Sequence, residues 1–143
     1  MREVPSPRQI VLAEDNPADV ELVREALHEH GVRCELLVIS DGEEVSIFID
    51  KLVLDTKLPC RDLLPLDLHL PRHDGAEVLK HLRASERCGQ TPVVVLSSSE
   101  LTADQQNAGK NAAAHYFRQP GSLHQFLRLG KIVKELMSRP QLS

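Results

Sequence analysis

The sequence predicts an open, doubly wound parallel α/β sheet with helices on both faces. Five short apolar runs alternate along the 143 residues with segments of helical periodicity, and this alternation is typical of repeated βαβ units. Polar residues that follow such runs gather at one edge of a parallel sheet, where ligands of these folds bind. We expect a single domain over residues 1–143, with its core over about residues 8–138 and no output domain.

The first half of the chain provides two strands and two helices. Residues 9–13 form the first predicted strand. Asn16 and Pro17 begin a helix, because asparagine caps helices and proline suits the first helical position. Gly31 ends this helix, and residues 34–39 form the second strand. The apolar stripes of the two helices are Val20, Val23 and Leu27, then Val45, Phe48, Ile49 and Leu52, the latter preceded by a capping box of Asp41 and Glu44.

The second half carries two features that disfavour regular structure. Pro65 stands within the third strand, where it removes a hydrogen-bond donor, and a local bulge is the explanation we expect. Residues 102–113 have almost no large apolar side chain, so a fourth helix there would be poorly anchored. The remaining predicted elements are a loop over residues 53–61, a third strand ending in Asp67, a helix opened by Asp74 and Gly75, strands over residues 92–96 and 114–118, and a last helix capped by Ser122.

Acidic residues follow two of the predicted strands. Glu14 and Asp15 end the first apolar run, and Asp67 ends the third. A buried strand has no structural use for an ionisable side chain, so Asp67 is either solvated at the strand end or held beside a cation. Three carboxylates in one pocket repel one another, and they take up protons or bind a hard cation such as Mg²⁺. If Asp67 attacks a phosphoryl group, the Ser97 hydroxyl at the end of the fourth strand can donate a hydrogen bond to a transferred oxygen.

Composition excludes several classes of protein. A formal charge of −4, without a lysine or arginine run, gives no footprint for nucleic acid. There is no signal-peptide pattern and no apolar run of membrane-spanning length, so we expect a cytoplasmic protein without membrane contact. Cys34, Cys60 and Cys88 lack CxxC spacing and are expected to be reduced thiols, with Cys60 and Cys88 not forming a redox pair.

The sequence resembles response regulator receiver domains over nearly its whole length. The residues that carry this resemblance are Glu14-Asp15 in LAEDNPADV, Asp67 in DLHLPRHDG, Ser97 in PVVVLSSS, and Tyr116 three residues before Gln119-Pro120. The resemblance implies a flavodoxin-like (βα)5 fold with strand order 2-1-3-4-5. It also implies a role in two-component phosphorelay signalling, as a phosphoacceptor rather than as an enzyme.

The resemblance gives each site residue a role. Asp67 would take a phosphoryl group from a histidine of a sensor kinase and become 4-aspartylphosphate. The ligands of Mg²⁺ would be Glu14, Asp15, Asp67 and the backbone carbonyl of His69. Ser97 and Tyr116 would be the switch pair that reports phosphorylation to the surface of the fourth helix, fifth strand and fifth helix. The DNPAD opening is similar to single-domain receivers that partner phytochrome-type kinases.

One departure from the family pattern leaves alternatives open. Receivers have lysine before the proline that follows the fifth strand, and this chain has Gln119. The protein could therefore be a pseudo-receiver, an interaction module that phosphorylation does not control, although the three acids argue against this. A hydrolase of the aspartate-nucleophile phosphatase class needs a second aspartate two residues after the nucleophile, where this chain has His69. We expect Asp67 to be phosphorylated and the switch to be weakened.

The last helix has more apolar residues than one face requires. Its expected core face comprises Leu123, Phe126, Leu127, Val133 and Met137. Leu129, Ile132 and Leu136 form a second stripe about 100° around the helix. Exposed apolar stripes of this kind mark contact surfaces, so we expect a homodimer or a kinase contact there. The alternative is that the C-terminal tail covers these residues.

Overall fold

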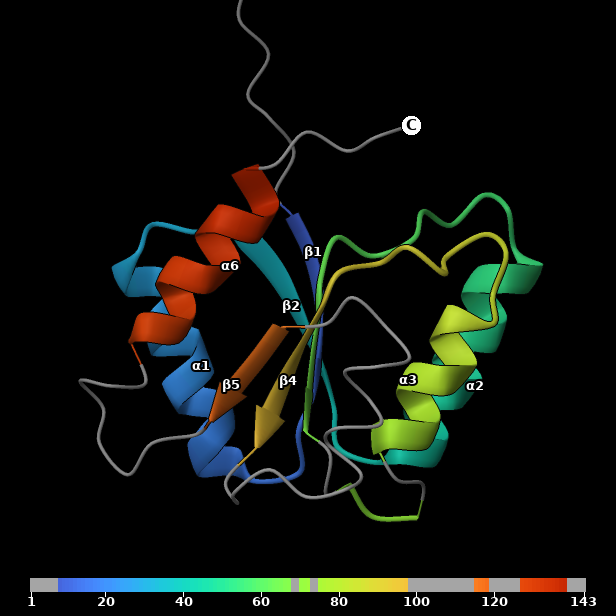
Figure 1. Ribbon diagram of the computed structural model, residues 1–143, viewed down its shortest axis with the longest axis horizontal. Helices are drawn as coiled ribbons and strands as arrows, with labels where there is room; N and C mark the ends of the chain where they lie inside the picture. The colour runs from blue at the N-terminus through green and yellow to red at the C-terminus, as the bar shows by residue number, and fades with distance from the viewer. Residues whose placement is uncertain (1–7, 68–69, 73–74, 98–114, 119–126, 139–143) are drawn as a thin grey trace, which may run out of the picture.

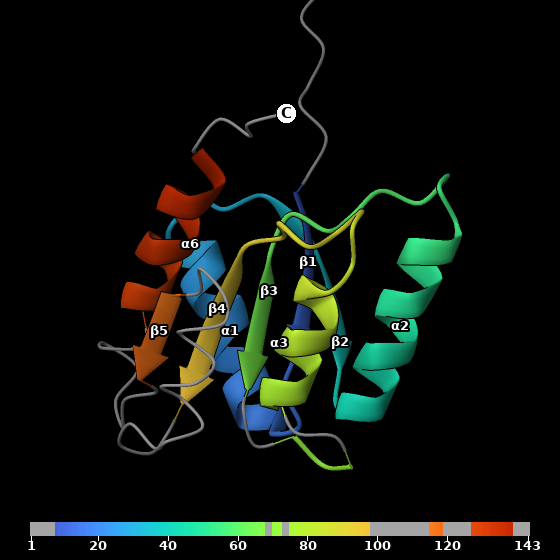
Figure 2. The same ribbon diagram turned by 45° about the vertical axis from the view of Figure 1, so that its right-hand side comes forward.

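The computed structural model describes residues 8–67, 70–72, 75–97, 115–118 and 127–138, which contain one five-stranded parallel sheet. Its strand order is β2-β1-β3-β4-β5, the flavodoxin-like order that the resemblance implies (Figure 2). The strands are β1 (Arg8–Ala13), β2 (Cys34–Ile39), β3 (Leu64–Asp67), β4 (Val93–Ser97) and β5 (His115–Arg118). The helices are α1 (Pro17–Glu29), α2 (Gly42–Leu54), α3 (Gly75–Arg83) and α6 (Arg128–Ser138). All five predicted strands are thus confirmed. The predicted helix over residues 102–113 lies outside the described residues.

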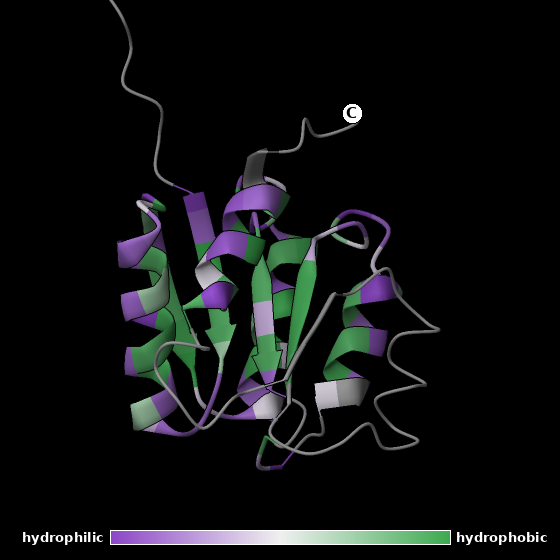
Figure 3. Cartoon of the chain, turned by 60° about the vertical axis from the view of Figure 1, so that its left-hand side comes forward, coloured by the Kyte–Doolittle hydropathy of each residue, from purple (hydrophilic) through white to green (hydrophobic). Residues whose placement is uncertain are grey.

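Helices cover both faces of the sheet. α1 and α6 pack on one face, while α2 and α3 lie on the other (Figures 1 and 2). Side chains of β1 alternate between these layers, so Val11 packs beneath α2 and α3 whereas Leu12 packs beneath α1 and α6. The strands are apolar along most of their length and the polar residues lie mainly on the helices (Figure 3). Such strands are typical of a parallel sheet that is buried on both faces.

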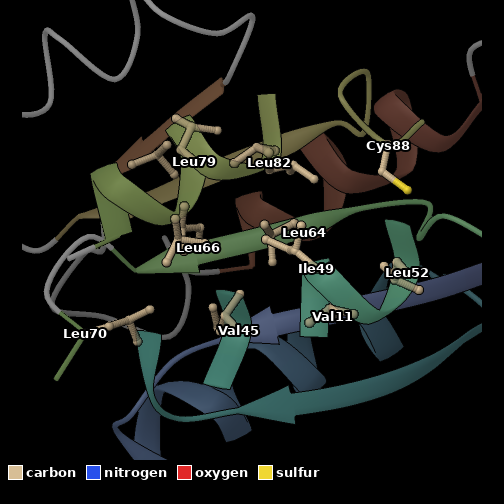
Figure 4. Close-up of a cluster of buried hydrophobic side chains, with 14 residues drawn as sticks. Val11, Val45, Ile49, Leu52, Leu64, Leu66, Leu70, Leu79, Leu82 and Cys88 are labelled. Carbon is tan, nitrogen blue, oxygen red and sulfur yellow. The ribbon is translucent and has the colours of Figure 1, made fainter. Parts of the chain in front are cut away.

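The core beneath α2 and α3 brings together residues of these two helices with residues of β1, β3 and β4. Figure 4 shows Val45, Ile49 and Leu52 of α2 facing the sheet, with Leu64 and Leu66 on β3 and with Leu79 and Leu82 of α3. The α2 positions match the apolar stripe that the sequence predicts for this helix. Among the described helices, none has the length and hydrophobicity of a membrane span.

The first two helices begin where the sequence predicts. The Asn16 side chain accepts a hydrogen bond of 2.9 Å from the Ala18 amide and caps α1. The Asp41 side chain accepts from the amide of Glu43 at 2.7 Å and caps α2. Gly31 follows α1 with a φ of +67°, a left-handed conformation that glycine adopts without steric cost. α2 runs through residues 53–54, which were expected to begin the following loop.

The pairing of β3 with β1 is irregular next to Pro65. The Asp62 amide donates to the Gln9 carbonyl, but the Val11 amide donates to Leu63 rather than to Asp62. In a regular parallel pair one residue would make both bonds, so the pairing departs from the regular pattern at Asp62 and Leu63. The regular pattern would next use an amide at residue 65, and proline has none. The register is the same on both sides of Pro65, since Ile10 pairs with Leu63 and Ala13 pairs with Leu66, so the predicted bulge is not present at Pro65.

The prediction that Cys60 and Cys88 are reduced thiols is wrong, because they form a disulfide. The two residues are 28 positions apart in sequence, but their Cα atoms are 5.6 Å apart. Cys60 lies in the segment before β3, and Cys88 lies between α3 and β4. Cys34 is a free thiol, as predicted. The fold therefore brings together two cysteines whose sequence spacing shows no pattern.

Arg87 reinforces the connection that the disulfide makes. Its guanidinium donates hydrogen bonds to four backbone carbonyls at the end of α2 and in the following loop, those of Leu52, Asp55, Thr56 and Leu58. A planar guanidinium with five N–H groups suits this task. The loop between α2 and β3 is thus held to the α3–β4 connection by one covalent bond and several hydrogen bonds.

α6 approaches α1 closely because residue 130 is glycine. A Cβ atom at Gly130 would lie 2.3 Å from the Ala26 carbonyl oxygen and 2.4 Å from the His30 ring. The His30 Nε2 atom donates to the Leu127 carbonyl at 2.9 Å, which joins the end of α1 to the start of α6. No other residue type fits at position 130 without moving one of these helices.

The orientation of α6 overturns part of the predicted contact surface. Leu129 is fully buried beneath α1 and α6 together with Val133, so its assignment to an exposed stripe is wrong. Ile132 and Leu136 are partly buried and pack against the same cluster. The predicted helix cap, Ser122, lies outside the described residues.

Candidate phosphoacceptor and metal site

Three acidic side chains meet at the carboxyl edge of the sheet. Glu14 and Asp15 directly follow β1, and Asp67 is the last residue of β3. β1 and β3 are neighbours, with Ala13 paired to Leu66, so the two strand ends lie together. One carboxylate oxygen from each of the three acids lies within 4.8 Å of the others. The shared acidic pocket predicted from the sequence is present.

Burial differs among the three acids. Glu14 is 1% exposed and Asp67 is 9% exposed, whereas Asp15 is exposed to solvent. The Glu14 backbone amide donates to the Ile39 carbonyl at 3.1 Å, which fixes the chain as it leaves β1. A Glu14 carboxylate oxygen accepts a hydrogen bond of 3.2 Å from the Asn16 amide. The buried pair is therefore held by backbone contacts, and Asp15 faces the solvent side of the pocket.

The buried acids cannot all carry charge without cost. Burial, followed by the negative charge of Asp67, raises the pKa of Glu14 from 4.5 to about 8. The Asn16 amide opposes this shift, and a hydrogen bond between the Glu14 and Asp67 side chains adds to it. At neutral pH and without a cation, the pair therefore retains a proton, mainly on Glu14.

Asp19 is a fourth acid near the site that the sequence analysis did not include. Its pKa is raised by burial and then by the charges of Asp67 and Asp15. Its position in the first turn of α1, four residues after Asp15, is the signal that could have identified it. Asp19 increases the negative field at the mouth of the pocket.

The donor set fits a hard divalent cation. Carboxylate oxygens are the preferred ligands of Mg²⁺, which keeps several waters and binds through one or two carboxylates. Three acids within one ion's reach, two of them buried, form a site whose mutual repulsion a cation would relieve. Glu14, Asp15 and Asp67 are the residues that would hold it.

The other predicted site residues are only partly described. Ser97 ends β4, and on this strand Leu96 pairs with Asp67, so the backbone of Ser97 lies at the same sheet edge as the acids. Tyr116 lies on β5 opposite Val95. His69 and Gln119 lie outside the described residues. The sheet thus brings the backbone of Ser97 to the acidic edge, as the strand order requires.

The fold and the three acids at the carboxyl edge of the sheet together define the class of protein. It is a flavodoxin-like domain with a candidate cation site centred on an aspartate. The family model of the response regulator receiver domain matches residues 10–129. The chain belongs to this family. It is 37% identical over 98 residues to the response regulator Rcp1 of Synechocystis sp., an alignment that covers 68% of this chain and 67% of Rcp1.

Two solved structures show the same likeness. The phosphorylated cyanobacterial phytochrome response regulator RcpA is 30% identical, with a TM-score of 0.78 over 92% of this chain and 94% of RcpA. The Mn²⁺-bound form of Rcp1 is 27% identical, with a TM-score of 0.78 over 96% of this chain and 99% of Rcp1. The family match and the likeness of fold therefore agree.

Proposed function

We propose that this receiver domain accepts a phosphoryl group on Asp67 from a phosphohistidine of a sensor kinase. The observation that carries the proposal is the convergence of Glu14, Asp15 and Asp67 at one sheet edge. Asp67 ends β3 with 9% of its surface exposed, so its carboxylate is fixed by the strand yet reaches the pocket. A structural role alone would not bring two further acids toward a buried aspartate.

The chemistry follows from the placement of the acids. A carboxylate oxygen of Asp67 bonds to phosphorus as the phosphorus–nitrogen bond of the phosphohistidine breaks, and the released imidazole takes a proton from water. Glu14, Asp15 and Asp67 would hold Mg²⁺, which would supply positive charge beside the carboxylates and the incoming phosphoryl oxygens. Glu14 must lose the proton that it shares with Asp67 before it can bind the cation, so Mg²⁺ binding should strengthen as the pH rises.

The response to phosphorylation depends on Ser97, Tyr116 and Gln119. By family resemblance, Ser97 and Tyr116 move toward the phosphoryl group, and a lysine at position 119 would strengthen their movement. A glutamine amide can donate a hydrogen bond but contributes no charge, and charge-assisted bonds are roughly twice as strong as neutral ones. We therefore expect a phosphorylated protein in which only part of the population switches.

The partner kinase is proposed from the relatives. RcpA, which is 30% identical to this chain, is by name a cyanobacterial phytochrome response regulator. Rcp1, which is 37% identical, is named a response regulator. We propose a phytochrome-type histidine kinase as the phosphodonor. Transfer from such a kinase, compared with transfer from a kinase of another sensory class, tests this assignment.

Labelling with acetyl phosphate tests the phosphoacceptor role directly. Intact mass should show one added phosphoryl group that requires Mg²⁺ and is lost in Asp67→Asn. Asp62→Asn is the matched control, because Asp62 precedes the same strand at the opposite edge of the sheet and bonds the Gln9 amide, which asparagine can also do. Normal labelling of Asp67→Asn, or labelling that chelation of Mg²⁺ does not change, would disprove the proposal.

Gln119→Lys distinguishes a weakened switch from a pseudo-receiver. Amide exchange around Ser97 and Tyr116 should change on addition of beryllofluoride, and the change should be larger in Gln119→Lys than in the wild type. An equally large response in both proteins contradicts a weakened switch. Absence of any response in either protein favours the pseudo-receiver.

A further inference from the structure

Arg72 has an unusual backbone conformation for a residue with a side chain. Its φ is +67°, and among the described residues it is the one non-glycine residue with a positive φ. The left-handed region is unfavourable for arginine because Cβ approaches the following carbonyl. Backbone strain of this kind persists only where surrounding contacts impose it, and it concentrates near functional sites.

The contacts that hold Arg72 come from the start of α2. Its Nε atom lies 3.2 Å from Oδ2 of Asp41, and its Nη1 atom lies 3.9 Å from a carboxylate oxygen of Glu43. The neighbouring Pro71 carbonyl accepts a hydrogen bond of 3.1 Å from the Gly42 amide. Leu70 is 7% exposed and packs in the same core cluster as Val45 of α2 (Figure 4). Three consecutive residues are therefore attached to one helix terminus.

Asp41 connects this attachment to the helix itself. Its Oδ1 atom accepts from the amides of Glu43 and Glu44, while its Oδ2 atom contacts Arg72. Each carboxylate oxygen thus has a different task, and the side chain is only 15% exposed. Because these capping hydrogen bonds orient the Asp41 side chain, Asp41 is a fixed partner for the Arg72 guanidinium.

We infer that Arg72 is a positioning residue of the phosphoacceptor site, acting through Asp41. Leu70 is only three residues beyond Asp67, so an anchor at residues 70–72 fixes where the chain leaves the acidic pocket. The inference rests on the proposed function, since it concerns how firmly the pocket holds Mg²⁺. Arg72 is not a catalytic residue, because its recorded contacts are with the start of α2 and not with the acids.

The sign of the expected effect separates positioning from simple electrostatics. Removing a positive charge near an acidic pocket should strengthen the binding of a cation. Loss of a positioning contact should instead weaken it. Arg72→Gly is the informative variant, because glycine accepts the positive φ while the ion pair is lost. We expect a roughly two- to fivefold rise in the Mg²⁺ dissociation constant, the size that an exposed ion pair supports.

The experiment is calorimetric titration of the full chain with Mg²⁺, together with acetyl phosphate labelling rates and urea unfolding of each variant. Asp41→Asn should weaken Mg²⁺ binding similarly, the double variant should be no weaker than Arg72→Gly alone, and Arg72→Lys should recover part of the loss. The exposed Arg33 provides a charge-matched control in a distant loop, so Arg33→Gly should leave the dissociation constant unchanged.

Each outcome decides one question. Unchanged or tighter Mg²⁺ binding in Arg72→Gly and Asp41→Asn, with wild-type labelling intact, overturns the inference and leaves the proposed function standing. Failure of the wild type to bind Mg²⁺ or to be labelled overturns the proposed function itself. If Arg72→Gly fails to fold, Arg72→Lys decides the question. It keeps the positive charge, so weaker Mg²⁺ binding supports positioning and unchanged binding overturns the inference.

Discussion

Replacing Glu14 by glutamine should remove most of the pH dependence of the metal-free protein's stability. Burial, and then the charge of Asp67, raises the pKa of Glu14 from 4.5 to about 8. The folded state therefore binds this proton more tightly than the unfolded state does. As a result, the free energy of unfolding should fall as pH rises between these two values. For one proton the slope is at most roughly 1.4 kcal/mol per pH unit.

The total effect is large enough to measure. Between about pH 5.5 and about pH 8, the linkage of one proton amounts to at most roughly 3 kcal/mol. In Glu14→Gln the side chain stays neutral, its carbonyl can still accept from the Asn16 amide, and its amide group can donate to Asp67. The variant should match the wild type at the acidic end and exceed its stability at the alkaline end. The Glu14→Gln variant is thus more stable without metal, but it has lost one of the three carboxylates that would bind the cation.

Urea unfolding in the presence of a chelator, at closely spaced pH values, measures this effect. Asp15→Asn is the control, because Asp15 is exposed and is not among the causes of the Glu14 shift, so it should keep the wild-type slope. Saturating Mg²⁺ should stabilise the wild type by about 2.7 kcal/mol at a hundredfold excess over its dissociation constant, mainly at alkaline pH. A wild-type slope in Glu14→Gln, or lower stability than the wild type near pH 8, would refute the reasoning.

Three further changes test the packing. Cys60→Ser, which removes the disulfide, should lower the free energy of unfolding by roughly 3–4 kcal/mol, whereas Cys34→Ser should change it little; equal stabilities would show that the disulfide does not form in solution. Gly130→Ala should destabilise the protein by about 1–3 kcal/mol in thermal unfolding, because the Cβ atom added at position 130 meets α1. Lys131→Ala, at an exposed position, is the control. If α6 mediates a homodimer, sedimentation should show dissociation in Ile132→Glu but not in Lys131→Ala, which changes the net charge equally. A wild type that is monomeric at every concentration contradicts the dimer.

The parts of the structure that depend on local sequence could be predicted. Asn16 and Asp41 determine their helix starts through bonds to amides two or three residues away. The acidic pocket was also predictable, although Glu14 and Asp67 are far apart in sequence. Parallel strands place their carboxyl ends at one edge, so the strand order alone brings these residues together.

The parts that depend on how elements pack against one another could not be predicted. Leu129 and Ile132 lie in the same predicted stripe, yet Leu129 is fully buried in the cluster shared by α1 and α6 whereas Ile132 is only partly buried. The disulfide depends on two loops meeting at the far edge of the sheet, which no spacing of Cys60 and Cys88 reveals. Arg72 has no sequence signal, because its role depends on a backbone angle and on a partner 31 residues earlier in the chain.

The irregular pairing of β3 with β1 and the missing amide of Pro65 have a consequence for the cohesion of the sheet. β1 and β3 are joined by fewer regular backbone bonds than a parallel pair of this length would make, and the three acids lie across this boundary. Glu14 and Asp15 belong to the half formed by β2 and β1, and Asp67 belongs to the half formed by β3, β4 and β5. An ion bound by all three would act as a cross-link between the two halves. Removing it should first accelerate hydrogen exchange at amides along this boundary, such as that of Val11, so the site also governs where the domain begins to open.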